Sequence, residues 1–127
     1  MAIKKNASVL YLDDEDINLF IFEANFKNKF NVITANSPTL ALELLESHKE
    51  EISAVISDMR MPLMNGIEFI QKAKSIHKNI PFYILTGFDH NTEIKDAVDN
   101  KIVSKYFIKP FDVNEIETEI NSVINNL

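Results

Sequence analysis

Short apolar runs alternate with longer amphipathic stretches along the whole chain. The runs are rich in branched and aromatic residues, which is typical of buried strands. The predicted strands cover residues 8–13, 30–35, 53–58, 81–86 and 105–109. After each run, apolar residues recur at helical spacing, so a helix is predicted to follow each strand. The residues expected to face the core are Ile17, Phe20, Ile21 and Ala24 in the first helix, Ala41, Leu42 and Leu45 in the second, Ile67, Ile70 and Ala73 in the third, Ile94, Ala97 and Val98 in the fourth, and Val113, Ile116, Ile120, Val123 and Ile124 in the last.

Capping residues mark the starts of two of these helices. Ser37 followed by Pro38 predicts the N-terminus of the second helix. Asp112, with Glu115 three residues later, approximates a capping box for the last helix. Strands that alternate with helices predict an α/β fold, a doubly wound parallel sheet with helices on both faces. A length of 127 residues suits one domain with a single core.

Composition and charge narrow the class of protein. Hydrophobic residues make up 46% of the chain and charged residues 25%, as in ordinary globular proteins. A net charge of −6 without a dense run of Lys and Arg argues against direct binding of DNA or RNA. The sequence has no run long enough to span a membrane, no recognisable signal peptide and no cysteine. We therefore expect a cytoplasmic protein.

Polar side chains stand at the ends of four predicted strands. Asp13 and Asp14 follow the first apolar run, Asp58 the third, Thr86 the fourth and Lys109 the fifth. Because the carboxyl ends of parallel strands lie along one edge of a sheet, these side chains are expected to meet there, near the switch point of the strand order.

The acidic residues of this set repel one another unless a cation lies between them. At about 4 Å, two carboxylates repel by ~4 kcal/mol at an effective dielectric constant near 20. Mg²⁺ suits such a cluster, because it prefers oxygen ligands and often binds phosphate as well. Lys109 and Thr86 supply an ammonium and a hydroxyl for the oxygens of a phosphoryl group. An aspartate can accept that group as an acyl phosphate.

Four segments make the chain similar to a known family. The acidic pair lies in LDDED, the third-strand aspartate in ISDMRMPLMNG, the hydroxyl in ILTG and the lysine in YFIKPF. In this order and spacing they resemble the receiver domains of two-component response regulators. The resemblance implies a flavodoxin-like (CheY-like) five-stranded sheet in the order 2-1-3-4-5 with five helices. It also implies that residues 1–127 form a single receiver domain without an output domain, which signals and assists its own phosphorylation and dephosphorylation but is not an enzyme.

The resemblance assigns roles at the proposed metal site. It implies that Asp58 is the phosphoacceptor, and that Asp14 and Asp58 bind Mg²⁺, or Mn²⁺, directly. The backbone carbonyl of Arg60 would complete the protein ligands, and Asp13 would act through a water molecule.

Four further positions match the phosphate-binding and switch residues of the family. Thr86 matches the switch hydroxyl, Lys109 the phosphate-binding lysine and Tyr106 the aromatic switch residue. Pro110 matches a proline that is usually preceded by a cis peptide bond. Thr86 and Tyr106 would together pass the signal to the surface.

The resemblance also implies partners. The phosphoryl donor would be a histidine kinase or a phosphotransfer protein. The signal would leave through the face formed by the fourth helix, fifth strand and fifth helix, toward a partner that the sequence does not name. Arg60 and Phe88, two residues after Asp58 and Thr86, either flank the path of water to the phosphoryl group and slow its hydrolysis, or point to solvent.

The sequence leaves several alternatives open. Leu19, Phe22 and Phe26 form a second apolar stripe on the first helix, which either widens the core contact or forms a protein–protein surface, so a dimer is possible. Asn100 stands where many family members have glycine, and is expected to take a left-handed conformation.

The other functions considered are a metal-dependent aspartyl phosphatase with Asp14 as nucleophile and an interaction module that works without phosphorylation. A flavin-binding domain is disfavoured, because the acidic block would repel the flavin phosphate.

Overall fold

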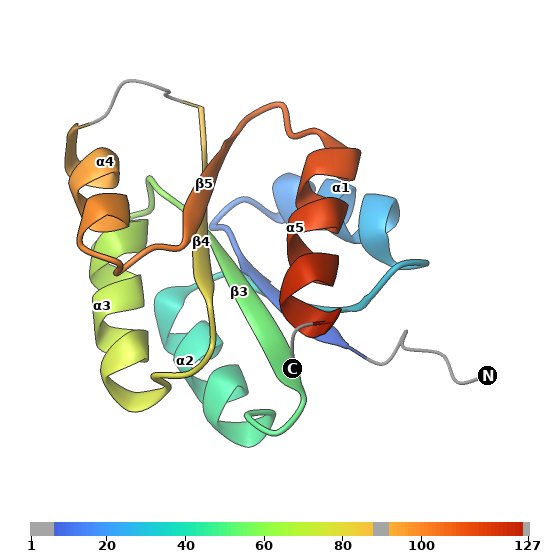
Figure 1. The fold of residues 1–127 in the computed structure, drawn as a ribbon, viewed down its shortest axis with the longest axis horizontal. Coiled ribbons are helices and arrows are strands. Elements are labelled where there is room, and N and C mark those ends of the chain that lie inside the picture. The colour runs from blue at the N-terminus through green and yellow to red at the C-terminus, as the bar shows by residue number, and fades with distance from the viewer. Residues whose placement is uncertain (1–6, 88–91, 126–127) are drawn as a thin grey trace.

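The structure is a computed structural model that describes residues 7–87 and 92–125. Strands and helices alternate along the described chain (Figure 1). Their bounds are β1 (Ser8–Leu12), α1 (Asp16–Phe26), β2 (Asn31–Ala35), α2 (Pro38–Ser47), β3 (Ile52–Asp58), α3 (Gly66–Ile76), β4 (Phe82–Thr86), α4 (Thr92–Asp99), β5 (Lys105–Ile108) and α5 (Val113–Asn125). All strands are parallel and lie in the order β2-β1-β3-β4-β5, which confirms the predicted flavodoxin-like fold.

Helices cover both faces of the sheet, with α2, α3 and α4 on one face and α1 and α5 on the other (Figure 1). Successive residues of a strand point to opposite faces. On β1, Leu10 and Leu12 therefore join the mainly aliphatic cluster toward α2–α4, here called the aliphatic core. Val9 and Tyr11 point toward α1 and α5. The cluster on that side, here called the aromatic core, contains Tyr11, Phe22, Phe26, Phe30, Tyr83 and Phe107.

Two helices, α2 and α5, begin at the capping residues that the sequence indicates. Ser37 Oγ accepts a hydrogen bond of 3.1 Å from the amide of Leu40, and Asp112 accepts from the first amides of α5. A complete capping box, formed by Asn65 and Glu68, starts α3. In α2 through α5 the residues expected to face the core are buried or partly buried against it. Within the described residues, no helix combines the length and apolar character needed to cross a membrane.

The prediction for α1 was wrong in its choice of face. The stripe expected to face the core is exposed, with Ile17 at 60% and Phe20 at 69%. Leu19, Phe22 and Phe26 are buried in the aromatic core instead, so their stripe is a core contact and not a protein–protein surface. Both stripes are apolar, so helical periodicity alone does not distinguish them. The exposed stripe comprises Ile17, Phe20, Ile21 and Ala24.

The turn after α4 also differs from the prediction. The left-handed residue is Lys101, with φ of 63°, and not Asn100. The amides of Ile102 and Val103 donate to the carbonyl of Ala97 at 2.9 and 3.2 Å. The chain therefore closes the carboxyl end of α4 one residue later than expected, because these hydrogen bonds require the reversal at Lys101.

The start of α3 lies against the end of β3. The amide of Gly66 donates to the carbonyl of Met59 at 2.9 Å. A Cβ atom at position 66 would collide with the carbonyl oxygen of Asp58 and lie 2.8 Å from Ile84 Cδ1. Only glycine permits this close approach, and it packs the start of α3 against the residue that ends β3.

Candidate functional site

The ends of four strands surround one cavity at the carboxyl edge of the sheet. Asp14 follows β1, Asp58 ends β3, Thr86 ends β4 and Lys109 follows β5. The cavity has a volume of about 260 Å³. Its lining residues are Asp14, Glu15, Asn18, Asp58, Arg60, Thr86, Gly87 and Lys109. Because the strands are parallel, residues far apart in sequence share this cavity.

Asp58 is buried at the end of β3 and still lines the cavity. It is 8% exposed, and its Oδ1 accepts a hydrogen bond of 3.0 Å from Lys109 Nζ. Burial raises the pKa of the Asp58 carboxyl above its ordinary value; the Lys109 ammonium opposes this rise and the charge of Asp13 adds to it. Ser57 Oγ donates to the Asp58 carbonyl at 2.8 Å, which fixes the backbone at this point. A buried carboxylate with a raised pKa beside an ammonium is typical of functional sites.

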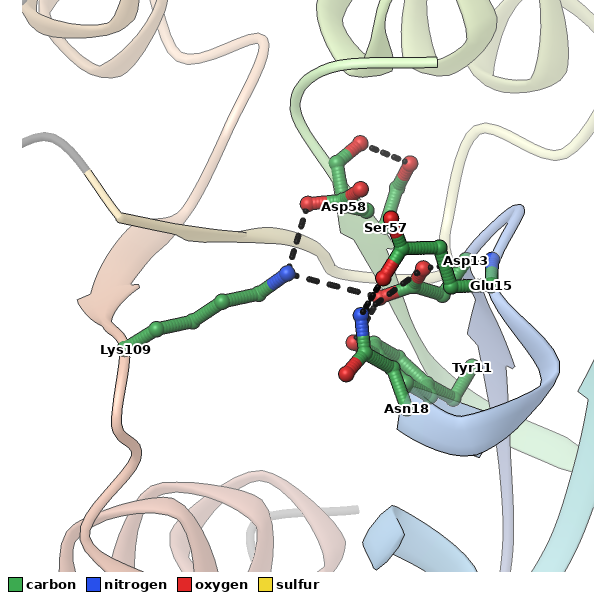
Figure 2. Close-up of polar contacts among 7 residues, drawn as sticks. All are labelled: Tyr11, Asp13, Glu15, Asn18, Ser57, Asp58 and Lys109. Atoms are coloured by element: carbon green, nitrogen blue, oxygen red, sulfur yellow. Dashed lines mark hydrogen bonds and ion pairs between the residues drawn. The ribbon is translucent and has the colours of Figure 1, made fainter. Parts of the chain in front are cut away.

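Asp13 lies behind the cavity wall with no exposed surface, and four donors surround its carboxylate (Figure 2). Its Oδ2 accepts from Tyr11 Oη at 2.7 Å and from Lys109 Nζ at 3.4 Å. Its Oδ1 accepts from the amide of Glu15 at 3.0 Å and from Asn18 Nδ2 at 3.3 Å. A fully buried carboxylate needs such partners, because burial without hydrogen bonds is very unfavourable.

The side chain of Lys109 extends across the edge of the sheet and joins two carboxylates (Figure 2). Burial lowers the pKa of the Lys109 ammonium, but the hydrogen bond to Asp58 and the charges of Asp58 and Asp13 raise it more, so it lies above its ordinary value. The group therefore stays charged at neutral pH. The Lys109–Pro110 peptide bond is cis, as the resemblance implies.

The carboxylates at this edge suit a divalent cation. Asp13, Asp14 and Asp58 each offer one oxygen, and these oxygens lie within 4.8 Å of one another. Asp14 is exposed, whereas Asp13 and Asp58 are buried. Carboxylate oxygens are the ligands that Mg²⁺ prefers, and a cation would offset the repulsion among them. The residues present therefore fit the metal that the sequence predicts.

The remaining predicted residues lie on different sides of the site. Thr86 is 1% exposed, and its carbonyl accepts from the amide of Lys109 at 2.7 Å. Arg60 is exposed at the mouth of the cavity. Tyr106 lies in β5, half-buried against the aliphatic core and not in the cavity. Phe88 lies outside the described residues.

Sequence reasoning misses Tyr11, because a tyrosine inside an apolar run resembles any other residue of a buried strand. Its ring stacks on Phe22 at 4.3 Å, and its hydroxyl reaches Asp13. Burial, and then the charge of Asp13, raise the pKa of Tyr11 well above its ordinary value, so the hydroxyl remains a donor. The signal in the sequence is the spacing, because residues two apart in an extended chain lie on the same side.

Comparison with known proteins agrees with this geometry. Residues 9–121 match the family model for the response regulator receiver domain. Sporulation initiation phosphotransferase F of Bacillus subtilis strain 168 is 28% identical over 120 residues, which cover 94% of each chain. The response regulator receiver protein CpdR of Brucella abortus strain 2308 is 32% identical, over 83% of this chain and 88% of the relative. Transcriptional regulatory protein ZraR of Escherichia coli K12 is 27% identical over 94% of this chain, which spans only 26% of that relative.

Solved structures show the same fold. A response regulator receiver domain protein from Clostridium thermocellum has a TM-score of 0.87 and 28% identity, over 94% of this chain and 95% of that chain. Chemotaxis protein CheY4 of Vibrio cholerae has a TM-score of 0.80 and 26% identity, over 92% of this chain and 98% of that chain. With the strand order, the acidic cluster and the family match in agreement, the chain belongs to the family of response regulator receiver domains of two-component systems.

Proposed function

We propose that this protein accepts a phosphoryl group on Asp58 from a histidine kinase or a phosphotransfer protein. The observation that carries the proposal is the 3.0 Å contact between Lys109 Nζ and Asp58 Oδ1, in a cavity that Asp14 and Thr86 also line. Family membership supports it, because receiver domains interact with such donors. In this proposal residues 1–127 act as one receiver unit.

The acidic residues of the cavity are the proposed holders of Mg²⁺, with Mn²⁺ as a substitute. Asp14, Asp58 and the backbone carbonyl of Arg60 are the direct ligands, and Asp13 acts through a water molecule. When bound, the cation offsets negative charge on the carboxylates and on the phosphoryl oxygens. The proposed need for a cation follows from the repulsion among the three carboxylates, whose oxygens lie within 4.8 Å of one another.

Asp58 is the nucleophile in the proposed reaction. One of its carboxylate oxygens forms a bond to phosphorus while the bond from phosphorus to the donor imidazole nitrogen breaks. The electron pair of the broken bond returns to the imidazole. Lys109 already contacts the carboxylate, so its ammonium can stabilise a phosphoryl oxygen after a small movement. Thr86 supplies a hydroxyl from the neighbouring strand end.

The proposed output uses Thr86 and Tyr106. A phosphoryl group adds roughly −1.5 to −2 charges, which attracts the Thr86 hydroxyl. In the sheet, Tyr106 on β5 lies beside Ile84 on β4, and Ile84 is two residues before Thr86. The ring of Tyr106 can therefore turn into the space that the Thr86 side chain leaves. The face formed by α4, β5 and α5 then differs between the two states. A downstream partner that binds one state better by ~1–3 kcal/mol would read the signal.

Phosphorylation by a small-molecule donor tests this function. Wild type and Asp58→Asn are incubated with acetyl phosphate, with Mg²⁺ or with a chelator, and their intact masses are measured. We expect one added phosphoryl group on wild type with Mg²⁺, none with the chelator and none on the variant. Uptake by Asp58→Asn at the wild-type rate would refute the assignment. Turnover of unrelated phosphate esters would favour an aspartyl phosphatase with Asp14 as its nucleophile.

A further inference from the structure

Asp13 is held by a contact that the proposed reaction does not use. Tyr11 Oη donates to Asp13 Oδ2 at 2.7 Å, which is shorter than the contacts from Glu15, Asn18 and Lys109. We propose that Tyr11 is a positioning residue of the cation site, whose hydroxyl fixes the Asp13 carboxylate and thereby strengthens divalent-cation binding. The inference rests on the proposed function, because it concerns the same site.

The position of the hydroxyl is set by the packing of the Tyr11 ring. Tyr11 is 1% exposed, and its ring lies 4.3 Å from that of Phe22 at an angle of 21°. Phe22 in turn packs on Phe26 at 4.6 Å and against Phe111 at 5.8 Å. The hydroxyl is therefore in place before any cation binds, so binding requires little further ordering of this carboxylate.

The donors around Asp13 show what loss of the hydroxyl would do. Of the two donors to Oδ2, only Lys109 at 3.4 Å would remain. Lys109 also donates to Asp58 at 3.0 Å, so the two carboxylates would compete for one ammonium. Tyr11 thus orients Asp13 and supplies the shorter of the two hydrogen bonds to Oδ2, so that Asp13 depends less on the ammonium that Asp58 also uses. Partners of direct metal ligands typically change metal affinity 10- to 100-fold when removed. Because Asp13 acts through a water molecule in the proposed site, we expect the loss of the Tyr11 hydroxyl to have an effect at the lower end of this range.

Tyr83 offers a matched control in the same aromatic core. Tyr83 has no exposed surface, and the centre of its ring lies 5.6 Å from that of Phe107. Its hydroxyl donates to Glu119 Oε2 at 3.0 Å, on α5 and away from the cavity. Tyr83→Phe therefore removes the same chemical group from the same core without touching the acidic cluster.

The test is the Mg²⁺ affinity of the full chain without any phosphoryl donor. Wild type, Tyr11→Phe and Tyr83→Phe are titrated with Mg²⁺, and backbone amide NMR signals near Asp14 report both the folded state and the dissociation constant. We expect Tyr11→Phe to bind Mg²⁺ about 10-fold more weakly, at the lower end of the range for such partners, and Tyr83→Phe to bind as wild type does. In an Asp13→Asn background, Tyr11→Phe should have no further effect.

Three results would overturn the inference while leaving the proposed function intact. They are an unchanged affinity in Tyr11→Phe, an equal loss in Tyr83→Phe, and a full effect of Tyr11→Phe in the Asp13→Asn background. The last two would mean that the hydroxyl stabilises the core in general and does not position Asp13. If wild type itself bound no Mg²⁺, the proposed function and this inference would fall together.

Discussion

Charged side chains at the amino edge of the sheet are arranged differently from those at the carboxyl edge. Toward the amino edge, Lys29 Nζ lies 3.2 Å from Glu117 Oε1, and both side chains keep about a third of their surface exposed, at 35% and 31%. At the carboxyl edge, Asp13 and Asp58 are buried and both contact Lys109. The amino edge pairs one acid with one base, both partly exposed, whereas the carboxyl edge buries two acids that share one base.

The difference separates charges that support the fold from charges that, in the proposed function, bind a cation. An exposed ion pair contributes ~0.2–1 kcal/mol and needs nothing more. Buried carboxylates that share an ammonium retain a negative excess, which lowers the stability of the fold until a cation offsets it. Proteins accept such a loss at sites where function requires it. The account therefore predicts that removing the charge of the buried Asp58 carboxylate raises stability while it abolishes the proposed function, and that changes away from the carboxyl edge do not have this pair of effects.

The largest expected effect concerns the apolar packing that both edges share. Phe26 has no exposed surface and ends α1 toward the amino edge, so Phe26→Ala should lower the free energy of unfolding by ~3–5 kcal/mol. Phe20, on the exposed face of α1, is the control, and Phe20→Ala should change it by no more than about 0.5 kcal/mol. Urea denaturation measures both. If Mg²⁺ changed the loss in free energy of unfolding caused by Phe26→Ala, core packing and the carboxyl edge would not contribute independently to stability.

The next effect compares one lysine from each edge. Lys109→Ala leaves Asp13 and Asp58 without their ammonium, and should slow phosphorylation by acetyl phosphate ~10²–10³-fold. Lys29→Ala breaks the exposed pair with Glu117 and should leave that rate unchanged. Intact-mass time courses give both rates. Similar slowing by the two changes would erase the distinction between the edges.

A smaller effect concerns the backbone that supports the carboxyl edge. Gly66→Ala should destabilise the protein by ~1–3 kcal/mol, because the new methyl group collides with the carbonyl of Asp58. Gly87 also lies at this edge, but a Cβ there meets nothing within 4 Å, so Gly87→Ala should change stability by no more than about 0.5 kcal/mol. Thermal unfolding distinguishes the two. Equal losses would show that the edge is sensitive to any added side chain.

The sequence predicted those features that follow from spacing and strand direction. Asp58, Thr86 and Lys109 end apolar runs, and parallel strands bring such ends together, so their convergence follows from topology. The core-facing sides of α2 through α5 follow from apolar residues that recur at helical spacing and are separated by polar residues.

Features that depend on competing packing were not predictable. Both stripes of α1 are apolar, and the choice between them is made by tertiary contacts such as the stack of Phe22 on Tyr11. The two-residue spacing places Tyr11 and Asp13 on the same side of the chain, but it does not specify the stack on Phe22 that brings the hydroxyl to the carboxylate. The reversal at Lys101 depends on hydrogen bonds back to α4, which residue preferences at Asn100 do not specify.

The smallest expected effect is also the most informative about the charge of Asp58. Because burial raises the pKa of this carboxyl in the folded protein, its ionised form lowers stability above that pKa. The loss disappears as the pH falls through the folded-state pKa toward the unfolded value. Asp58→Asn should therefore be more stable than wild type near pH 7, and the difference should narrow on acidification. Denaturation curves across this pH range measure the difference in stability between the two proteins. A difference that widened on acidification would contradict the claim that the ionised Asp58 carboxylate lowers stability.

The most direct measurement is the free energy of unfolding of wild type and Asp58→Asn at pH 7, with and without Mg²⁺. Without Mg²⁺ the variant should be more stable by ~0.5–2 kcal/mol, because it removes a buried charge and keeps the shape of the side chain. With Mg²⁺ wild type should gain more stability than the variant, since a ligand stabilises the state that binds it. A variant that is less stable without Mg²⁺, and that gains as much from Mg²⁺ as wild type does, would contradict the account of the carboxyl edge.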